Sequence, residues 1–244
     1  MAQIFILPQL KSVTKEEVLD IVKSLKKRKA TGSDKVSNEL LKACSEELAP
    51  ILADFFTDMF KQSVHLNEFK HAITTLLLKP FKPKGRTKSY RPVVLSSNIG
   101  KVFEKLIANR FRYLAETHKL LLTLRFGSPG RDTTKALQAI LSPFYTGWCT
   151  KHQTTLLSLD ITGAFDCVDR AKLLQVLVDK GIPDWLIRLT ASFLSDRSTT
   201  LNMLGIMFDP FWVDIGIPQE SPLSPILFLF SASSRLTLFE RRTL

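Results

Sequence analysis

Residues that could bind a metal ion stand directly after an apolar run in the middle of the chain. Residues 156–159 are mostly leucine, Asp160 follows them, and Asp166 and Asp169 come next. We expect the apolar run to form a short buried strand and residues 163–164 to form a tight turn. Such a strand places Asp160 at the edge of a sheet, where an ion can reach it. Because Asp166 and Asp169 are available to cap the next helix, a metal-binding role for Asp160 is preferred to the ordinary role of a cap.

A carboxylate in this position suits phosphoryl transfer. Transfer to a 3′ hydroxyl needs two divalent ions about 3.5–4 Å apart, held by carboxylates. Asp160 is therefore the candidate catalytic residue, and its carboxylate and the backbone carbonyl of Ile161 are the candidate metal ligands. Magnesium prefers such oxygen ligands, so the expected cofactor is Mg²⁺, with Mn²⁺ as the alternative ion.

A second chemical signal is the positive charge of the chain. The 244 residues carry a formal net charge of +11, and the sequence pI is about 9.7. Residues 79–91 contain no acid and hold the candidate nucleic-acid contacts Lys82, Lys84, Arg86 and Lys88. A polyanionic partner is expected, with nucleic acid preferred to a membrane surface, although a solvated basic face is the simpler alternative.

Other site classes and targeting signals find little support. The three cysteines are odd in number and widely spaced, which argues against a disulfide framework or a zinc ribbon. The first ten residues lack a basic leader, and no apolar run is long enough to span a bilayer. We expect an intracellular protein of the nucleus or cytoplasm with no membrane partner; the mitochondrion and the oligomeric state stay open.

The periodicity of apolar residues predicts helices interrupted by extended segments. Thr14, Ser97 or Asn98, Asp169 and Asp184 are the expected helix caps. Further helices are expected at about 38–44 and 50–62, and from about 134 and 224, with Phe55, Phe56, Met59 and Phe60 in the core. Strands are expected at 71–79, 90–95, 198–204 and 211–217, with a basic hairpin joining the first two.

Five segments, in this order, resemble blocks of the reverse transcriptases of non-LTR retrotransposons, particularly those of the fungal type. They are KKRKATGSDKVSNELLK, KSYRPVVLSSNIGKVFEKLIANRF, RFGSPGRDTTKAL, SLDITGAFDCVDRAKLLQVL and GIPQESPLSPILF. The resemblance implies an α+β fold of fingers and a partial palm, with an incomplete antiparallel palm sheet backed by helices. It implies a helical opening segment of the fingers at 1–70, fingers with a basic hairpin at 71–150, a partial palm at 151–230 and a divergent tail at 231–244.

The resemblance also implies roles for single residues. Asp160 corresponds to the first catalytic metal ligand, and Phe165 to the aromatic gate against a ribose 2′ hydroxyl; a plain core role for Phe165 fits the sequence nearly as well. Lys79 and Arg91 correspond to cationic contacts to the triphosphate, although the choice among Lys79, Lys82 and Lys84 stays open. Arg91 is the safer assignment because its planar fork binds phosphate oxygens in pairs. Gln219 and Ser221 correspond to the loop that lines the nucleotide and template pocket.

The chain departs from the family pattern in three places. Glu220 stands where the family has a second glycine, so its Cβ would strain a backbone that needs positive φ, and its carboxylate would face a pocket for polyanions. Phe81 replaces a glycine in the basic turn, a milder departure of the same kind. No Asp follows Asp214, so we expect a C-terminally truncated fragment that lacks the Asp-Asp hairpin and does not polymerise alone.

The expected function is therefore that of a fragment of an RNA-directed DNA polymerase. Its implied partners are an RNA template, a DNA primer and deoxynucleotides. The main alternative is a catalytically dead remnant that binds nucleic acid through its basic fingers. A third, an intron-encoded maturase, fits the segment KKRKATGSDKVSNELLK less well.

Overall fold

The structure, a computed structural model, describes residues 12–121, 133–156, 158, 161–203 and 205–240. Its helices are α1 (Lys15–Ser24), α2 (Asn38–Ala43), α3 (Ser45–Gln62), α4 (Asn98–Thr117), α5 (Thr133–Cys149), α6 (Arg170–Asp179), α7 (Asp184–Leu194) and α8 (Ser224–Glu240). Its strands are β1 (His71–Leu78), β2 (Tyr90–Leu95), β3 (Ser198–Met203), β4 (Ile206–Met207) and β5 (Phe211–Trp212). Short 3₁₀ helices precede β1 at Asn67–Phe69 and β2 at Thr87–Ser89. The predicted α+β class is confirmed.

Most of the predicted helix caps are present. The side chains of Thr14, Ser97 and Asp169 each accept a hydrogen bond from the backbone N–H three residues later. Such a bond satisfies one of the backbone donors that a helix leaves open at its start. The prediction was wrong for α7, where Pro183 is the cap and Asp184 is the first helical residue.

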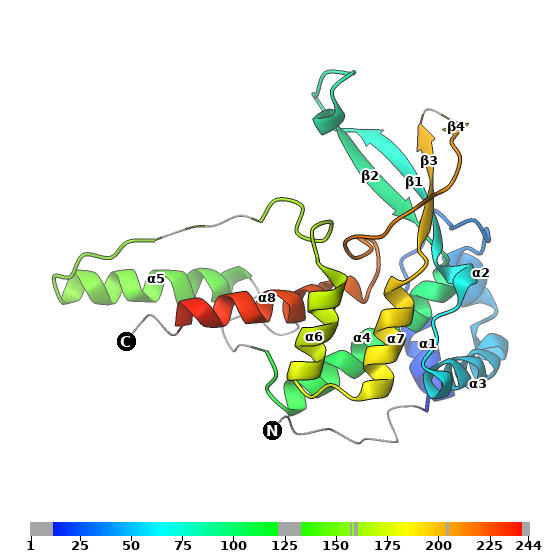
Figure 1. The fold of residues 1–244 in the computed structure, drawn as a ribbon, viewed down its shortest axis with the longest axis horizontal. Helices are drawn as coiled ribbons and strands as arrows, with labels where there is room; N and C mark the ends of the chain where they lie inside the picture. The colour runs from blue at the N-terminus through cyan, green and yellow to red at the C-terminus, as the bar shows by residue number, and fades with distance from the viewer. Residues whose placement is uncertain (1–11, 122–132, 157, 159–160, 204, 241–244) are drawn as a thin grey trace.

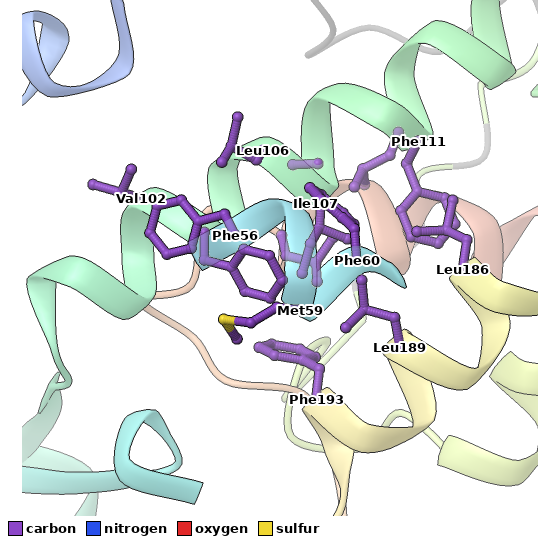
Figure 2. Packing of buried hydrophobic residues seen from close by; sticks show 14 of the residues in the cluster. Phe56, Met59, Phe60, Val102, Leu106, Ile107, Phe111, Leu186, Leu189 and Phe193 are labelled. Carbon is purple, nitrogen blue, oxygen red and sulfur yellow. The ribbon is translucent and has the colours of Figure 1, made fainter. Parts of the chain in front are cut away.

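The hydrophobic core is built around α4 (Figure 1). Buried side chains of α1, α3, α6, α7 and α8 join it, and these helices together with α4 form the helical body of the molecule. Figure 2 shows aromatic and aliphatic side chains of α3, α4 and α7 meeting there. The ring of Phe103 lies 5.2 Å from that of Phe56 and 5.1 Å from that of Phe60, measured between centroids. Phe55 does not join them, because it lies on the outer side of α3 and is 39% exposed.

The sheet is mixed, and this corrects the expectation of an antiparallel palm sheet. The strand order is β2-β1-β3-β4, with β5 also paired to β3. β1 pairs antiparallel with β2 but parallel with β3, with His71 opposite Ser198. Parallel pairing needs a long crossover, and the chain supplies one through the helices between β2 and β3. The far end of the β1–β2 hairpin projects away from the helices (Figure 1).

The buried strand expected before Asp160 is not found in the described residues. Residues 152–156 and 158 belong to no strand, and Leu156 is 59% exposed. Leu157, Leu159 and Asp160 itself lie outside the described residues. A strand needs a neighbour for its backbone hydrogen bonds, and the described strands all belong to the β1–β5 sheet.

None of the helices in the described part of the chain combines the length and the apolar character needed to cross a membrane.

Candidate functional site

Two segments that are far apart in the chain are joined by hydrogen bonds beside the sheet. They are residues 161–170, which lead into α6, and residues 213–219, which follow β5. The backbone N–H of Ile217 donates to the carbonyl of Phe165 (2.9 Å), and that of Gly216 donates to the carbonyl of Val168 (3.1 Å). The side chain of Gln219 donates through Nε2 to Oδ1 of Asp166 (2.7 Å). Residues 161–170 and the Gly-x-Pro-Gln segment at 216–219 therefore form one unit.

Gly216 allows the close approach of these two segments. Its φ is +77°, a value that residues other than glycine rarely adopt. A Cβ added there would lie 2.7 Å from the carbonyl oxygen of Asp166 and 2.8 Å from that of Phe165. The position requires glycine for its backbone conformation and also for the space around it.

Arg170 strengthens the same junction from the start of α6. Its Nε donates to the carbonyl of Gly216 (2.9 Å), and its NH2 donates to the carbonyl of Val213 (2.7 Å). Burial lowers the pKa of Arg170, and the nearby charge of Asp214 opposes that shift. The guanidinium remains charged, since arginine is not deprotonated in proteins.

A pocket of about 180 Å³ opens between this junction and the sheet. The strands contribute small and apolar side chains, among them Thr74, Val94 and Thr199. The charged and amide side chains at the pocket are Lys70, Asp166, Arg170, Arg197 and Gln219. Positive charge exceeds negative charge on these walls, so the pocket favours an anionic or phosphorylated ligand.

Arg197, the residue just before β3, is held in a fixed direction. Its NH1 donates to the carbonyl of Phe193 (2.9 Å), and its guanidinium carbon lies 4.8 Å from the centroid of the Phe193 ring. Both contacts come from the end of α7. Burial lowers the pKa of Arg197, while the carboxylate of Glu104 opposes the shift.

Two buried ionisable groups, His65 and Glu104, lie close enough to Arg197 to interact with its charge. Nε2 of His65 lies 3.7 Å from Oε1 of Glu104, and both side chains are almost completely buried. Burial raises the pKa of Glu104, and the charge of Arg197 and a hydrogen bond with Ser221 oppose the rise. Burial first, and then the cations Arg197 and Lys70, lower the pKa of His65 to about 3. The contact between His65 and Glu104 is therefore not a simple ion pair at neutral pH, because the histidine is uncharged.

Some of the residues predicted for nucleotide binding lie together and others do not. Gln219 lines the pocket, whereas Ser221 is buried beneath the loop, where its hydroxyl accepts from the backbone N–H of Leu223 (3.1 Å). The half-buried ring of Phe165 packs edge-on against Phe228 of α8, with centroids 5.4 Å apart. Ile161 is exposed, and Asp160 lies outside the described residues.

The predicted cationic contacts lie on the hairpin. Nζ of Lys79 donates to the carbonyl of Lys88 (2.7 Å), so the Lys79 head group closes the base of the turn. Arg91 is exposed on β2, between Tyr90 and the pocket-lining Pro92. Because side chains alternate along a strand, Arg91 lies on the face of the sheet opposite the pocket. The tip of the hairpin is the segment 79–89 between β1 and β2. Its cations Lys82, Lys84, Arg86 and Lys88 are all exposed.

Glu220 causes neither of the problems expected of it. It is exposed, it is absent from the pocket walls, and it is not among the described residues with positive φ. The positive φ is instead at Gly216, four residues earlier. Phe81, by contrast, does hold a left-handed backbone, with φ of 60°.

The described residues alone do not make a metal site. Among them no group of three or more His, Cys, Asp or Glu side chains lies close enough to hold an ion. Asp166, the carboxylate nearest the pocket, is already bonded to Gln219. The proposed magnesium ligand Asp160 lies outside the described residues.

Sequence reasoning missed Lys70, Glu104, Arg170 and Arg197. A usable signal existed for Glu104, because it stands four residues from both Gly100 and Ala108 on an otherwise apolar face of the helix. For Lys70 and Arg197 no local signal was available. Their burial depends on the pairing of β1 with β3, which the sequence pattern does not specify.

Residues 82–242 match the family model described as "Reverse transcriptase (RNA-dependent DNA polymerase)". The chain is 28% identical over 220 residues to the probable RNA-directed DNA polymerase from transposon BS of Drosophila melanogaster, covering 90% of the chain and 24% of that protein. It is 29% identical over 213 residues to the corresponding protein of the X-element of Drosophila melanogaster, covering 87% of the chain and 23% of that protein.

A third similarity is to the RNA-directed DNA polymerase from the mobile element jockey of Drosophila funebris. The identity is 29% over 230 residues, which cover 90% of the chain and 24% of that protein. The chain thus spans about a quarter of the length of these relatives. These three relatives come from Drosophila species, and the fungal type stays a prediction.

Proposed function

The chain belongs to the reverse transcriptase family, and we propose that its residues form the nucleotide-binding and template-binding part of an RNA-directed DNA polymerase of a non-LTR retrotransposon. Its substrates are then an RNA template, a DNA primer and deoxynucleotides. The fingers comprise residues 1–70 and 71–150, the palm portion comprises 151–230, and 231–244 form a tail.

One observation supports this proposal above the others. Residues 161–170 and 213–219, which resemble two separate polymerase motifs, are hydrogen-bonded to each other and line a single pocket. The cationic side chains of Lys70, Arg170 and Arg197 at this pocket suit the phosphates of an incoming nucleotide. Gln219 and Asp166 offer amide and carboxylate groups at the same opening.

The remaining assignments rest on the resemblance. Asp160 and the carbonyl of Ile161 would hold Mg²⁺, or Mn²⁺ in its place, and the ion would neutralise the triphosphate. Phe165 would exclude a 2′ hydroxyl, and the edge-on contact with Phe228 supports a fixed position for its ring. Ser221 would shape the loop from beneath. Lys79 and Arg91 would contact phosphates from the hairpin, although Arg91 does so only from the face opposite the pocket.

Primer extension by the full-length protein tests the catalytic part of this proposal. The reaction contains a DNA primer on an RNA template, deoxynucleotides and Mg²⁺, and extension is expected. Asp160→Asn should abolish it, because an amide is a poor ligand for the ion. Asp169→Asn is the matched control, since asparagine caps a helix as well as aspartate does. Equal extension by the wild type and Asp160→Asn, or no extension by either, would overturn the proposal; the second result would favour a remnant that only binds nucleic acid.

A further inference from the structure

The turn at the end of the β1–β2 hairpin carries an aromatic side chain in an unusual state. The strand pairing ends at Leu78 and Tyr90, and one further bond, from the N–H of Lys79 to the carbonyl of Ser89 (2.8 Å), continues it. The N–H of Lys82 then donates to the carbonyl of Lys79 (3.2 Å) and closes a tight turn. Phe81 lies inside this turn, directly after β1. The hairpin of β1 and β2 projects from the rest of the molecule (Figure 1).

Phe81 is unfavourable in two independent ways. Its ring is completely exposed (105% of the reference area), so its apolar surface stays in water. Its φ of 60° lies in the left-handed region, where a bulky side chain is strained. Among the described residues it makes no ring or cation contact and packs on no part of the core. Nothing within the described part of the molecule therefore compensates for placing this ring here.

Basic residues follow Phe81 closely along the segment between β1 and β2. Lys82, Lys84, Arg86 and Lys88 are exposed, and residues 79–91 contain no acid. Within the described part of the chain, none of these cations forms an ion pair. Exposed aromatic rings among unpaired cations are the arrangement with which proteins hold single strands. The cations follow the phosphates, and the ring stacks on a base.

We propose that Phe81 is a stacking platform for an unpaired base of a single-stranded nucleic acid, whose phosphates are held by the cations of the same turn. The proposal rests on the proposed function for its identification of that strand as the template. A protein partner is less suitable, because the recognition of proteins uses clustered apolar anchors at a desolvated centre. The aromatic side chain of Phe81 instead stands alone in a segment of basic residues.

The test uses the chain of residues 1–244 and oligonucleotides of equal charge. Fluorescence anisotropy measures binding to r(U)₁₂, to d(T)₁₂ and to a twelve-residue abasic deoxyribose-phosphate strand. Phe81→Ala should weaken binding to r(U)₁₂ and d(T)₁₂ by about 5-fold to 150-fold, the range for losing one base–aromatic stack. It should leave binding to the abasic strand unchanged, because that strand has phosphates but no bases. Phe81→Tyr should bind like the wild type, and Phe55→Ala, at a partly exposed phenylalanine of the helical body, should do the same.

A second variant separates stacking from the shape of the turn. Phe81→Gly removes the ring and also relieves the left-handed strain, so the thermal midpoint should rise or stay constant while affinity for r(U)₁₂ falls as in Phe81→Ala. A loss of affinity that occurs equally on the abasic strand would overturn the proposal, as would unchanged binding of r(U)₁₂ by both variants. Binding to phosphatidylserine vesicles that depends on Phe81, without such dependence for r(U)₁₂, would assign the tip to a membrane surface instead.

These measurements need no nucleotide addition. Failure of the stacking test, with polymerase activity that depends on Asp160 intact, overturns this inference alone. Failure of primer extension, with base-dependent binding through Phe81 intact, overturns the polymerase proposal and leaves a single-strand binding turn.

Discussion

Phe103 and Phe81 show how differently two regions of this molecule use the same side chain. Phe103 is completely buried in α4, where its ring packs against Phe56 and Phe60. Phe81 is completely exposed at the hairpin tip, in a strained conformation. The helical body gains stability from packing, whereas the tip combines basic residues with the solvent-exposed ring of Phe81. The body should therefore respond to cavities and pH, and the tip should respond to salt and to the bases of a ligand.

The largest expected effect is a cavity in the body. Phe103→Ala should lower the free energy of unfolding by about 3–5 kcal/mol, because it removes a buried ring that its neighbours cannot replace. Urea denaturation measures this free energy. Phe81→Ala is the comparison, and because Phe81 is exposed its free energy of unfolding should change by no more than about 0.5 kcal/mol. Similar losses in the two variants would mean that the tip is packed like the body.

Alanine substitutions at two glycines with positive φ distinguish the cost of steric crowding from the cost of backbone strain. Gly216→Ala should lower the free energy of unfolding by about 2–4 kcal/mol, since strain and overpacking act together. Gly85→Ala at the hairpin also has a positive φ, of +88°, but no atom lies within 4 Å of its added Cβ. It should therefore cost only the strain, about 1–2 kcal/mol. Urea denaturation of both variants checks this, and an equal cost would contradict the close approach of Gly216 to residues 165–166.

The buried histidine predicts a pH dependence in the body. The unfolded chain binds a proton at His65 near pH 6.5, whereas the folded chain does so only near pH 3. Stability should thus fall as the pH drops below about 6.5, by about 2 kcal/mol between pH 6.5 and pH 5 from this group. The raised pKa of Glu104 acts in the opposite direction, because it favours the folded state at lower pH.

A variant isolates the contribution of His65. His65→Phe places a ring among the aromatic neighbours Phe69, Phe103 and Phe193 and removes the titration. Denaturation curves between pH 5 and pH 7 should lose this acid-dependent component in His65→Phe and keep it in His152→Phe, where the histidine is exposed. An unchanged pH slope in His65→Phe would show that another group carries it.

The smallest expected effect on stability belongs to the cations of the tip. Lys82→Ala and Lys84→Ala should each leave the free energy of unfolding within about 0.5 kcal/mol of the wild type. Each should weaken binding to r(U)₁₂ and reduce the slope of log K against log salt by about 0.7, the value for one released counterion on a single strand. Lys61→Ala, at an exposed lysine on α3, is the matched control. Equal salt slopes in all of these variants would argue against phosphate contacts at the tip.

The sequence predicted those parts of the fold that local chemistry determines. The caps at Thr14, Ser97 and Asp169 and the β1–β2 hairpin follow from residues that lie close together in the chain. For the association of residues 161–170 with 213–219, the family resemblance gave only separate roles for Phe165 and Gln219 at a nucleotide. The association depends on Gly216, whose closeness to the other segment no local pattern reveals.

The predictions that failed depended on contacts between distant segments. The parallel pairing of β1 with β3 joins residues about 127 positions apart, as between His71 and Ser198. Glu220 was expected to occupy a strained position, but the positive φ lies at Gly216. Leu156 was assigned to a buried strand from its apolar character alone, although burial also requires a partner strand.

The measurement that tests the pocket most directly is the retention of a chain-terminated DNA primer on an RNA template by residues 1–244 in the presence of each deoxynucleotide. We expect the templated deoxynucleotide to strengthen retention more than the other three, and Gln219→Ala to remove this preference. Glu220→Ala, at the exposed neighbour outside the pocket, should keep it. Equal retention with all four deoxynucleotides by the wild type would contradict the assignment of the pocket to the incoming nucleotide.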